Sequence, residues 1–414
     1  MTIATADVPA IAGGKPIKTT PFTKLPRYGE EELTELREAI AQQNLFYAGG
    51  KKVKELEKQF ATLRGATHAV ACSSGTAAIH SATMAVGISP DDEVIVPCIT
   101  DMGTILPVMW QGAVPVFADL DPKTYNLDPK AVEAAITDKT KAIIAVHLAG
   151  NPCDLTALKQ IADKHKLILI EDCAQAHGCH YNEKPVGIVG QIGCYSFNEF
   201  KHIACGDGGI AITSDDKLAQ RLRLATDKCY DRSAGVAQRQ GPFMANNYRM
   251  TELQGAVALA QVRKLDSIIS RRQSWCGRLT KRLANLPGLQ LPAVQERGSH
   301  SYWFYMMRVD PQVLGAKADD FAKAISKEGV PCSAHYIGQP IYKYPLFVNH
   351  SAFSRGEHHY SRVDYTKVKN ATAEAILETC VILPVNESYS DADLEDTVKA
   401  FERVVTYFQA KKSA

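Results

Sequence analysis

The feature that most constrains this sequence is a series of short apolar runs between residues 65 and 215, separated by polar or helical stretches. The runs are nearly continuous in apolar residues instead of alternating with polar ones. Strands covered by helices on both faces have this composition, because neither face meets water. The sequence therefore predicts an α/β fold with a mostly parallel, seven-stranded sheet between helices, with strands at His68–Cys72, Glu93–Pro97, Val114–Ala118, Lys141–His147, Leu167–Ile170, Cys194–Phe197 and Gly209–Thr213.

The whole chain has 414 residues, which is long enough for a second domain. A long helix is predicted from Thr251 to about Arg271, and residues 286–300, with two prolines and two glycines, have the composition of a linker. A strand at Tyr302–Val309 and a final amphipathic helix capped by Ser390 predict a smaller α+β domain. We expect an N-terminal arm and large domain over residues 1–285 and a small domain over residues 286–414.

Composition excludes several classes of partner. Lys and Arg number 47 against 45 Asp and Glu, so the net charge of +2 offers no field for nucleic acid or an anionic membrane. We find no signal peptide or transmembrane pattern. No two of the eleven cysteines have C-x-x-C spacing, so no metal site is predicted. A cytoplasmic protein with buried free cysteines is expected.

Small polar residues follow the first predicted strand, where ligands of open α/β sheets bind. Ser74, Gly75 and Thr76 end a strand and open a helix. Small residues let backbone N–H groups approach an anion, and a helix N-terminus favours negative charge. A phosphate cradle and an ordinary capped helix start both fit this segment.

Two ionisable residues follow other strands. An unpaired buried carboxylate is costly, so Asp172 needs a partner. It would either pair with a protonated ring nitrogen of a cofactor, or cap a helix or form a buried salt bridge. Lys201, five residues after Ser196, becomes a nucleophilic amine if its site desolvates it, although most lysines are merely solvated. Together, a phosphate cradle, a carboxylate and a lysine amine are the parts of a pyridoxal phosphate enzyme.

The order of these motifs resembles the DegT/DnrJ/StrS family of fold-type I aminotransferases, which act on keto sugars and cyclitols. The resemblance extends from about Pro26 to Phe408. Within the family, the sequence is most similar to the branch of scyllo-inosose aminotransferases and aminohydroxybenzoate synthases. Similarity to this branch rests on segments that include Thr124–Asp128. The motifs that carry the resemblance to the family are Ser74–Thr76, Glu93–Pro97, Glu171–Gly178, Ser196 with Lys201, Gly206–Gly209, Asn247–Gln254 and Leu383–Pro384.

The resemblance implies a role for each site residue. Lys201 would hold pyridoxal 5′-phosphate as a Schiff base and move a proton between cofactor and substrate. Asp172 would pair with the pyridine nitrogen, and Gln175 would lie near the phenolic oxygen. The residues assigned to the cofactor phosphate are Ser74, Gly75, Thr76, Ser196 and, from a neighbouring subunit, Asn247. A homodimer with shared active sites follows, which would transfer an amino group from glutamine or glutamate to a keto cyclitol or keto sugar.

One departure from the family concerns Asp101, which stands where relatives usually carry an aromatic residue that stacks on the cofactor. Its carboxylate either lies beside cofactor and substrate or merely caps a helix. Further candidates for recognising the acceptor are His335, Tyr336 and Tyr342, while His147 is either a support of the site or a core histidine. A sugar dehydratase, an aromatizing aminohydroxybenzoate-type synthase and a cofactor-binding regulator without turnover are alternative functions.

Overall fold

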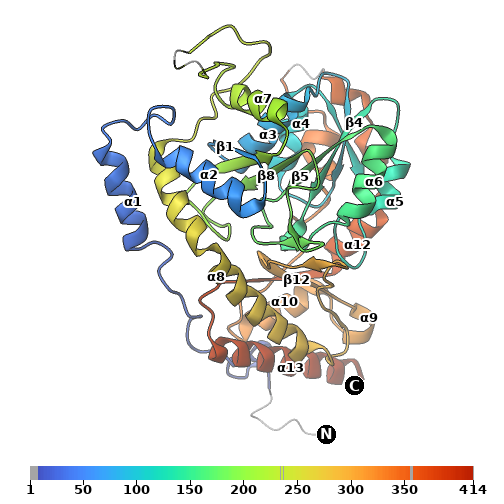
Figure 1. Ribbon diagram of the computed structural model, residues 1–414. Coiled ribbons are helices and arrows are strands. Elements are labelled where there is room, and N and C mark those ends of the chain that lie inside the picture. Colours follow the sequence, from blue (N-terminus) through green and yellow to red (C-terminus); the bar gives the residue numbers. More distant parts are fainter. Residues whose placement is uncertain (1–7, 234, 236, 355–357, 414) are drawn as a thin grey trace.

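The computed structural model describes residues 8–233, 235, 237–354 and 358–413. Its largest element is a seven-stranded sheet in the order β1–β9–β8–β5–β4–β2–β3 (Figure 1). β9 is antiparallel to both neighbours, and the other six strands share one direction, which confirms the predicted mostly parallel sheet. The strands are β1 (His68–Cys72), β2 (Glu93–Pro97), β3 (Val114–Ala118), β4 (Thr140–Val146), β5 (Ile168–Asp172), β8 (Ile192–Ser196) and β9 (Gly209–Thr213).

Helices flank this sheet on both sides (Figure 1). β8 and β9 are buried at every position, as expected for strands covered on two faces. A cluster of apolar side chains from strands and helices forms the main core. The helices of this layer are α2 (Lys52–Arg64), α3 (Gly75–Val86), α4 (Met102–Trp110), α5 (Pro129–Ala134), α6 (Leu155–His165), α7 (Asp216–Thr226) and α8 (Glu252–Leu283).

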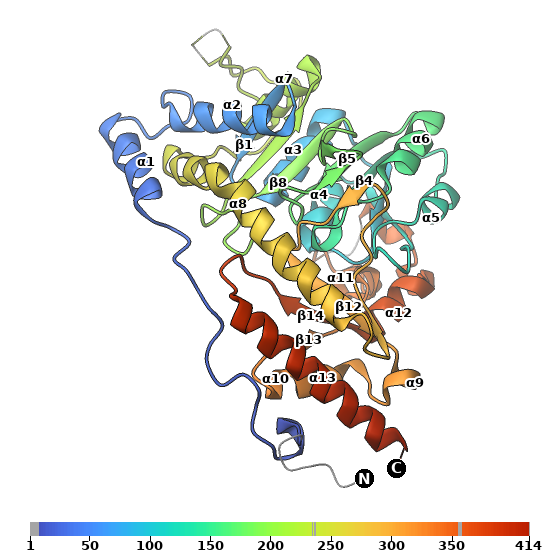
Figure 2. The same cartoon turned by 60° about the horizontal axis from the view of Figure 1, so that its bottom comes forward.

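A second sheet lies below the first, in the antiparallel order β10–β12–β14–β13 (Figure 2). A third, short sheet has three strands in the order β11–β6–β7. The additional elements are β6 (His180–Tyr181), β7 (Lys184–Pro185), β10 (Leu289–Gln290), β11 (Gly298–Ser299), β12 (Phe304–Val309), β13 (Ser333–Ala334), β14 (Cys380–Pro384), α9 (Pro311–Leu314), α10 (Ala318–Lys327), α11 (Pro345–Val348), α12 (Ala371–Thr379) and α13 (Asp391–Ser413).

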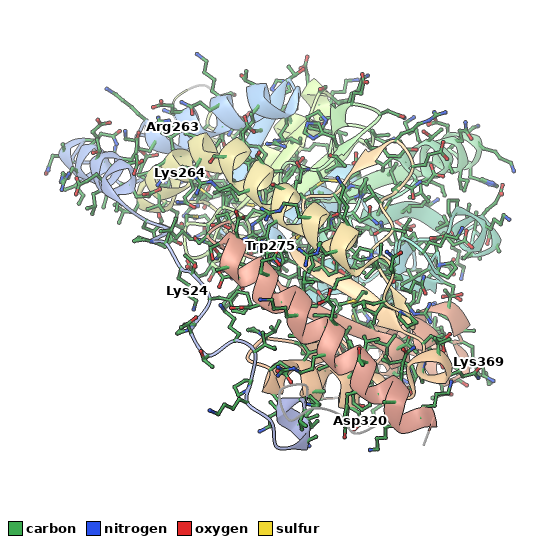
Figure 3. The ribbon with its side chains drawn as sticks, turned by 90° about the horizontal axis from the view of Figure 1, so that it is seen from below. Lys24, Arg263, Lys264, Trp275, Asp320 and Lys369 are labelled. Atoms are coloured by element: carbon green, nitrogen blue, oxygen red, sulfur yellow. The ribbon has the colours of Figure 1, made fainter. Side chains whose placement is uncertain are left out.

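α8 has 32 residues and is long enough to connect the two layers. It is longer than the sequence pattern indicated. The prediction ended this helix near Arg271, but Trp275, Leu279 and Leu283 continue its buried face into the second core. Figure 3 shows Trp275 on α8 beside α13. The division after residue 285 stays a prediction. At the start of α13, Ser390 accepts the N–H of Asp393, as a helix cap does.

The start of α8 is held by hydrogen bonds that reach α2. Thr251 and Gln254 form a capping box at the N-terminus of α8. The buried carboxylate of Glu252 accepts the backbone N–H groups of Lys52 and Val53, at 2.7 and 3.0 Å. α1 (Glu30–Ala41) packs along α8 farther out. Basic residues of α8, including Lys264, which is labelled in Figure 3, form ion pairs with acidic residues of α1.

The N-terminal arm lies on the second core (Figure 2). The side chain of Glu328 is fully buried and accepts the N–H groups of Ala10 at 2.8 Å and Ile17 at 3.0 Å. The Arg403 guanidinium lies 3.1 Å from the same carboxylate. One buried carboxylate thus holds the arm against α10 and α13.

All eleven cysteines are free. Within the described residues, no helix has the length and apolar character that a membrane span requires.

We predict that Glu328→Ala loosens the arm, because two backbone N–H groups lose their acceptor. The free energy of unfolding should fall by about 1–3 kcal/mol, and the amides of Ala10 and Ile17 should exchange with solvent faster. Hydrogen exchange and denaturant unfolding measure both effects. Glu402→Ala, at an exposed position of α13, is the control and should change neither. Unchanged exchange at Ala10 and Ile17 in the Glu328 variant would contradict this account.

Candidate active site

A pocket of about 220 Å³ lies at the carboxyl ends of β1, β5 and β8, where open α/β sheets bind ligands. It brings together residues that are more than 120 positions apart in the sequence. Among the residues predicted to bind the cofactor, Asn247 is the one that is not among the residues lining it. The predicted residues that do line the pocket are Ser74, Gly75, Thr76, Asp101, Asp172, Gln175, Ser196 and Lys201.

The N-terminus of α3 forms one end of the pocket. Ser74 caps the helix, with its hydroxyl oxygen accepting the N–H of Ala77 at 3.0 Å. A Cβ atom at Gly75 would lie 2.6 Å from the Cβ of Ser196, so only glycine allows this close approach of α3 to β8. Backbone N–H groups, the hydroxyls of Thr76 and Ser196 and the helix dipole meet here, which is the composition of an anion site.

Asp172 ends β5 as a buried carboxylate, only 4% exposed. Thr104 donates its hydroxyl to one carboxylate oxygen at 2.8 Å, and the N–H of Ala174 donates to the other at 3.0 Å. Burial raises the pKa of Asp172, while these hydrogen bonds and the charge of Lys201 act in the opposite direction. The carboxylate is therefore held in a fixed position and is available to a cationic partner in the pocket.

Lys201 lies in the turn after β8 and is 9% exposed. Its backbone N–H donates to the carbonyl of Asn198 at 2.9 Å, and its carbonyl accepts from Arg27 of the N-terminal arm at 2.9 Å. Burial lowers the pKa of the Lys201 amine to about 8, against the attraction of Asp172 and Asp101. A substantial fraction of the amine is therefore neutral near physiological pH and can act as a nucleophile.

Gln175 is fixed by both ends of its amide. Its oxygen accepts the N–H of Ala149 at 2.8 Å, and its nitrogen donates to the Tyr336 hydroxyl at 3.4 Å. Tyr336 therefore lies beside the pocket, as proposed. His335 instead contacts Asp319 at 2.8 Å, and Tyr342 is fully buried with its hydroxyl on Glu374. Neither side chain is among those lining the pocket, and their partners lie on α10 and α12.

Asp101 combines the two roles that the sequence left open. Its Oδ1 accepts the N–H of Gly103 at 2.7 Å, so it caps α4. It is also exposed, lines the pocket and acts electrostatically on Lys201. Capping and facing the ligand space are therefore compatible for this residue.

Asn247 is exposed at the base of the loop that leaves α7. It forms an isolated β-bridge with Asp227, whose buried carboxylate is 2.5 Å from Arg249 and 2.7 Å from the Tyr47 hydroxyl. Arg232 contacts the same carboxylate. This network fixes the base of the loop, and Asn247 is not among the residues that line the pocket of its own chain.

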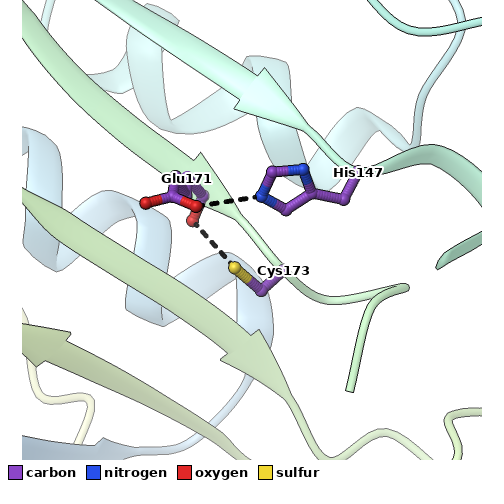
Figure 4. A group of neighbouring side chains, drawn as sticks. All are labelled: His147, Glu171 and Cys173. Carbon is purple, nitrogen blue, oxygen red and sulfur yellow. Dashed lines mark hydrogen bonds and ion pairs between the residues drawn. The ribbon is translucent and has the colours of Figure 1, made fainter. Parts of the chain in front are cut away.

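One group of possible metal ligands occurs among the described residues, namely His147, Glu171 and Cys173 (Figure 4). His147 Nδ1 accepts the N–H of Cys153 at 3.1 Å, and its Nε2 lies 3.1 Å from Glu171. Glu171 also accepts three backbone N–H groups, from Gly187, Val189 and Gly190. The sequence left His147 as a support or a core residue, and its hydrogen bonds make it part of a buried network beneath Asp172.

Sequence reasoning missed two residues that contact Lys201. Arg27 belongs to the arm, and Trp303 directly precedes β12, with its ring centroid 3.6 Å from Lys201 Nζ. The apolar pattern at Tyr302–Val309 indicated a strand only. Nothing in that pattern indicates that the Trp303 ring lies against a lysine about one hundred residues earlier in the chain, because the contact depends on how the two layers pack.

The sequence matches the family model for DegT/DnrJ/EryC1/StrS aminotransferases over residues 26–402. GDP-perosamine synthase of Caulobacter vibrioides is 34% identical over 357 residues, which cover 86% of this chain and 91% of the relative. A putative L-glutamine:3-amino-2,3-dideoxy-scyllo-inosose aminotransferase of Streptoalloteichus tenebrarius is 35% identical over 349 residues, covering 82% of each chain.

The fold is likewise that of known enzymes. The crystal structure of 3-amino-5-hydroxybenzoic acid synthase superimposes with a TM-score of 0.83 at 28% identity, covering 94% of this chain and 100% of the other. The family match extends across both sheets and includes every residue of the pocket. The chain therefore belongs to the DegT/DnrJ/EryC1/StrS aminotransferase family, whose members are pyridoxal-phosphate-dependent sugar aminotransferases.

Proposed function

We propose that this protein transfers an amino group from glutamine or glutamate to a keto cyclitol or keto sugar of the scyllo-inosose type. The observation that carries the proposal is the pocket that contains a buried carboxylate and a buried amine beside a helix N-terminus. The relative from Streptoalloteichus, named as an L-glutamine-dependent inosose aminotransferase, supports this choice of donor and acceptor.

The residues present fit pyridoxal 5′-phosphate. The phosphate would bind the N-terminus of α3 at Ser74, Gly75 and Thr76, together with the hydroxyl of Ser196. Asp172 would pair with the ring nitrogen, and Gln175 would lie along the ring edge. The tight approach of Gly75 to Ser196 leaves backbone N–H groups accessible to the phosphate. This donor set is neutral apart from Asp172 and Lys201, so no basic cluster is required.

Pyridoxal phosphate supplies an electron sink for the carbon that carries the amino group. Lys201 Nζ would hold the cofactor covalently when neutral, and when free it would move a proton between the two reacting carbons. Asp172 would stabilise positive charge on the ring nitrogen of the cofactor, because both of its oxygens are already oriented by Thr104 and Ala174. Burial of both groups excludes water, which strengthens their electrostatic interaction.

We also propose a homodimer with shared sites. Large apolar side chains are exposed on the arm, on α1, on the loop after it and on the turn that holds Lys201. Arg27 and the Leu45 carbonyl connect these segments to the lysine turn and to α8, so they share one side of the chain. Contiguous exposed apolar surface marks an interface. The residues of this arm–α1 patch are Leu25, Tyr28, Leu33, Ile40, Leu45, Phe46 and Phe200.

Attachment of the cofactor to Lys201 can be measured directly. Purified protein with pyridoxal phosphate should show a visible absorbance band and, after borohydride reduction, a permanent mass increase on the Lys201 peptide. The attachment rate should rise with pH through about 8 and then level off, because only the neutral amine attacks. Lys201→Ala should abolish both signals, whereas Lys130→Ala, at an exposed surface lysine, should retain them. A protein without cofactor uptake would refute the proposal.

The donor and acceptor are tested by half-reactions. L-glutamine or L-glutamate should convert the bound cofactor to its amino form, and scyllo-inosose should restore the original spectrum and yield an amino cyclitol by mass spectrometry. myo-Inositol, which lacks the ketone, is the control. Restoration only by a nucleotide-linked keto sugar would shift the acceptor class toward that of the perosamine synthase relative. A product that lost water without gaining nitrogen would indicate a dehydratase.

The shared site is tested by mixing an inactive Lys201→Ala chain with an impaired Asn247→Ala chain. If Asn247 contacts the phosphate in the neighbouring subunit, Asn247→Ala should weaken cofactor retention at least several-fold. The matched control is Asn246→Ala, at the adjacent exposed asparagine. A hybrid dimer of Lys201→Ala and Asn247→Ala chains contains one fully native site and should regain part of the activity. Absence of recovery, in a mixture shown to exchange subunits, would exclude sharing.

A further inference from the structure

The ring of Trp303 lies directly against the amine of Lys201. The distance from Nζ to the ring centroid is 3.6 Å, well inside the range of a cation–π interaction. The indole N–H donates to the carbonyl of Phe200, the residue before Lys201, at 2.7 Å. Trp303 therefore contacts both the side chain of the lysine and the backbone that carries it.

Trp303 is itself fixed by groups other than Lys201. Its backbone N–H donates to the Ala149 carbonyl at 2.8 Å, and its own carbonyl accepts from Arg272 at 3.3 Å. Arg272 is 2% exposed and forms an ion pair with Glu387 at 2.8 Å. Because these contacts hold the main chain on both sides, the position of the ring does not depend on where the amine lies.

The charged groups that act on the Lys201 amine are two carboxylates. Asp172 from β5 and Asp101 from the start of α4 act on it from the pocket. Burial lowers the pKa values of His177 and His202, so these neighbours are neutral at physiological pH. The Trp303 ring thus provides an uncharged surface that attracts an ammonium group without neutralising it by a proton transfer.

We propose that Trp303 is a positioning residue that holds the Lys201 amine against its ring face whenever this amine is not attached to the cofactor. The proposal rests on the function proposed above. In that reaction Lys201 must be released from the cofactor, remain beside the reacting carbons and reattach. A flexible four-carbon side chain loses rotamer entropy when it is held. A ring that is already fixed reduces the space that the released amine can explore and keeps its proton close to the pocket.

The test measures the pKa of Lys201 in cofactor-free full-length protein. Acetic anhydride reacts only with neutral amines, so its reaction rate with the Lys201 peptide, followed by mass spectrometry across pH, gives the midpoint. Trp303→Leu removes the π face and should lower this midpoint by about 0.5–1 pH unit. Trp303→Phe keeps a face and should shift it less. Trp110→Leu, at a half-exposed tryptophan of α4, should leave it unchanged.

A second substitution at position 303 separates the effect of the ring charge from any disruption of the fold. Trifluorotryptophan at position 303 keeps the shape and the indole N–H but withdraws charge from the ring face, so the midpoint should again fall. An unchanged midpoint with both trifluorotryptophan and Trp303→Leu would overturn the proposal.

The loaded enzyme provides an independent measurement. In Trp303→Leu, steady-state turnover with L-glutamate and scyllo-inosose should lose about tenfold or more in kcat with little change in KM, and the cofactor should remain attached. A loss confined to KM would contradict a role in holding the amine. If wild-type protein takes up no cofactor, the proposed function fails, but the acetylation midpoints still decide whether Trp303 holds Lys201.

Discussion

The structure depends on the burial of two oppositely charged groups, Asp172 and Lys201, at one edge of the main sheet. Burial raises the pKa of the carboxyl and lowers that of the amine, so each group is displaced toward its neutral form. Their mutual attraction opposes both shifts. A buried pair of this kind persists only where surrounding groups satisfy the remaining hydrogen bonds. Thr104 and Ala174 do so for the Asp172 carboxylate, and Arg27 donates to the backbone carbonyl of Lys201, so α4, β5 and the N-terminal arm all contribute to this edge.

The neighbouring carboxylates of β5 show how strand geometry separates structure from chemistry. Successive side chains of a strand point to opposite faces, so Glu171 and Asp172 enter different environments. Glu171 accepts three backbone N–H groups and contacts His147, which completes its hydrogen bonding (Figure 4). Asp172 retains access to the pocket. Glu171 therefore fixes the loop around Gly187 and supports the strand end from behind, leaving Asp172 oriented toward a ligand.

Much of this arrangement could be predicted, because local sequence determines it. Each strand of the main sheet is a near-continuous apolar run, and the residues after those runs meet at one edge by the geometry of parallel strands. The contacts of Trp303 and Arg27 could not be predicted, since both arise from packing between the second layer, the arm and the lysine turn. The same reason applies to His335 and Tyr342, whose polar partners lie away from the pocket. Asn247 stays a prediction because its proposed partner is another chain.

Asp101 shows how a change of one residue type alters what a pocket favours. Its Oδ1 is occupied by the helix N-terminus, while within the described part of the chain Oδ2 has no hydrogen-bond partner. An aromatic ring at this position would add an apolar surface, whereas a carboxylate adds an acceptor and a negative charge beside Lys201 and Tyr336. Acceptors that present hydroxyl or amino groups gain a hydrogen bond there, and those that present an anionic group meet repulsion. A polyol ketone with hydroxyls around its ring suits this environment, so the residue that departs from the family pattern is consistent with the proposed acceptor.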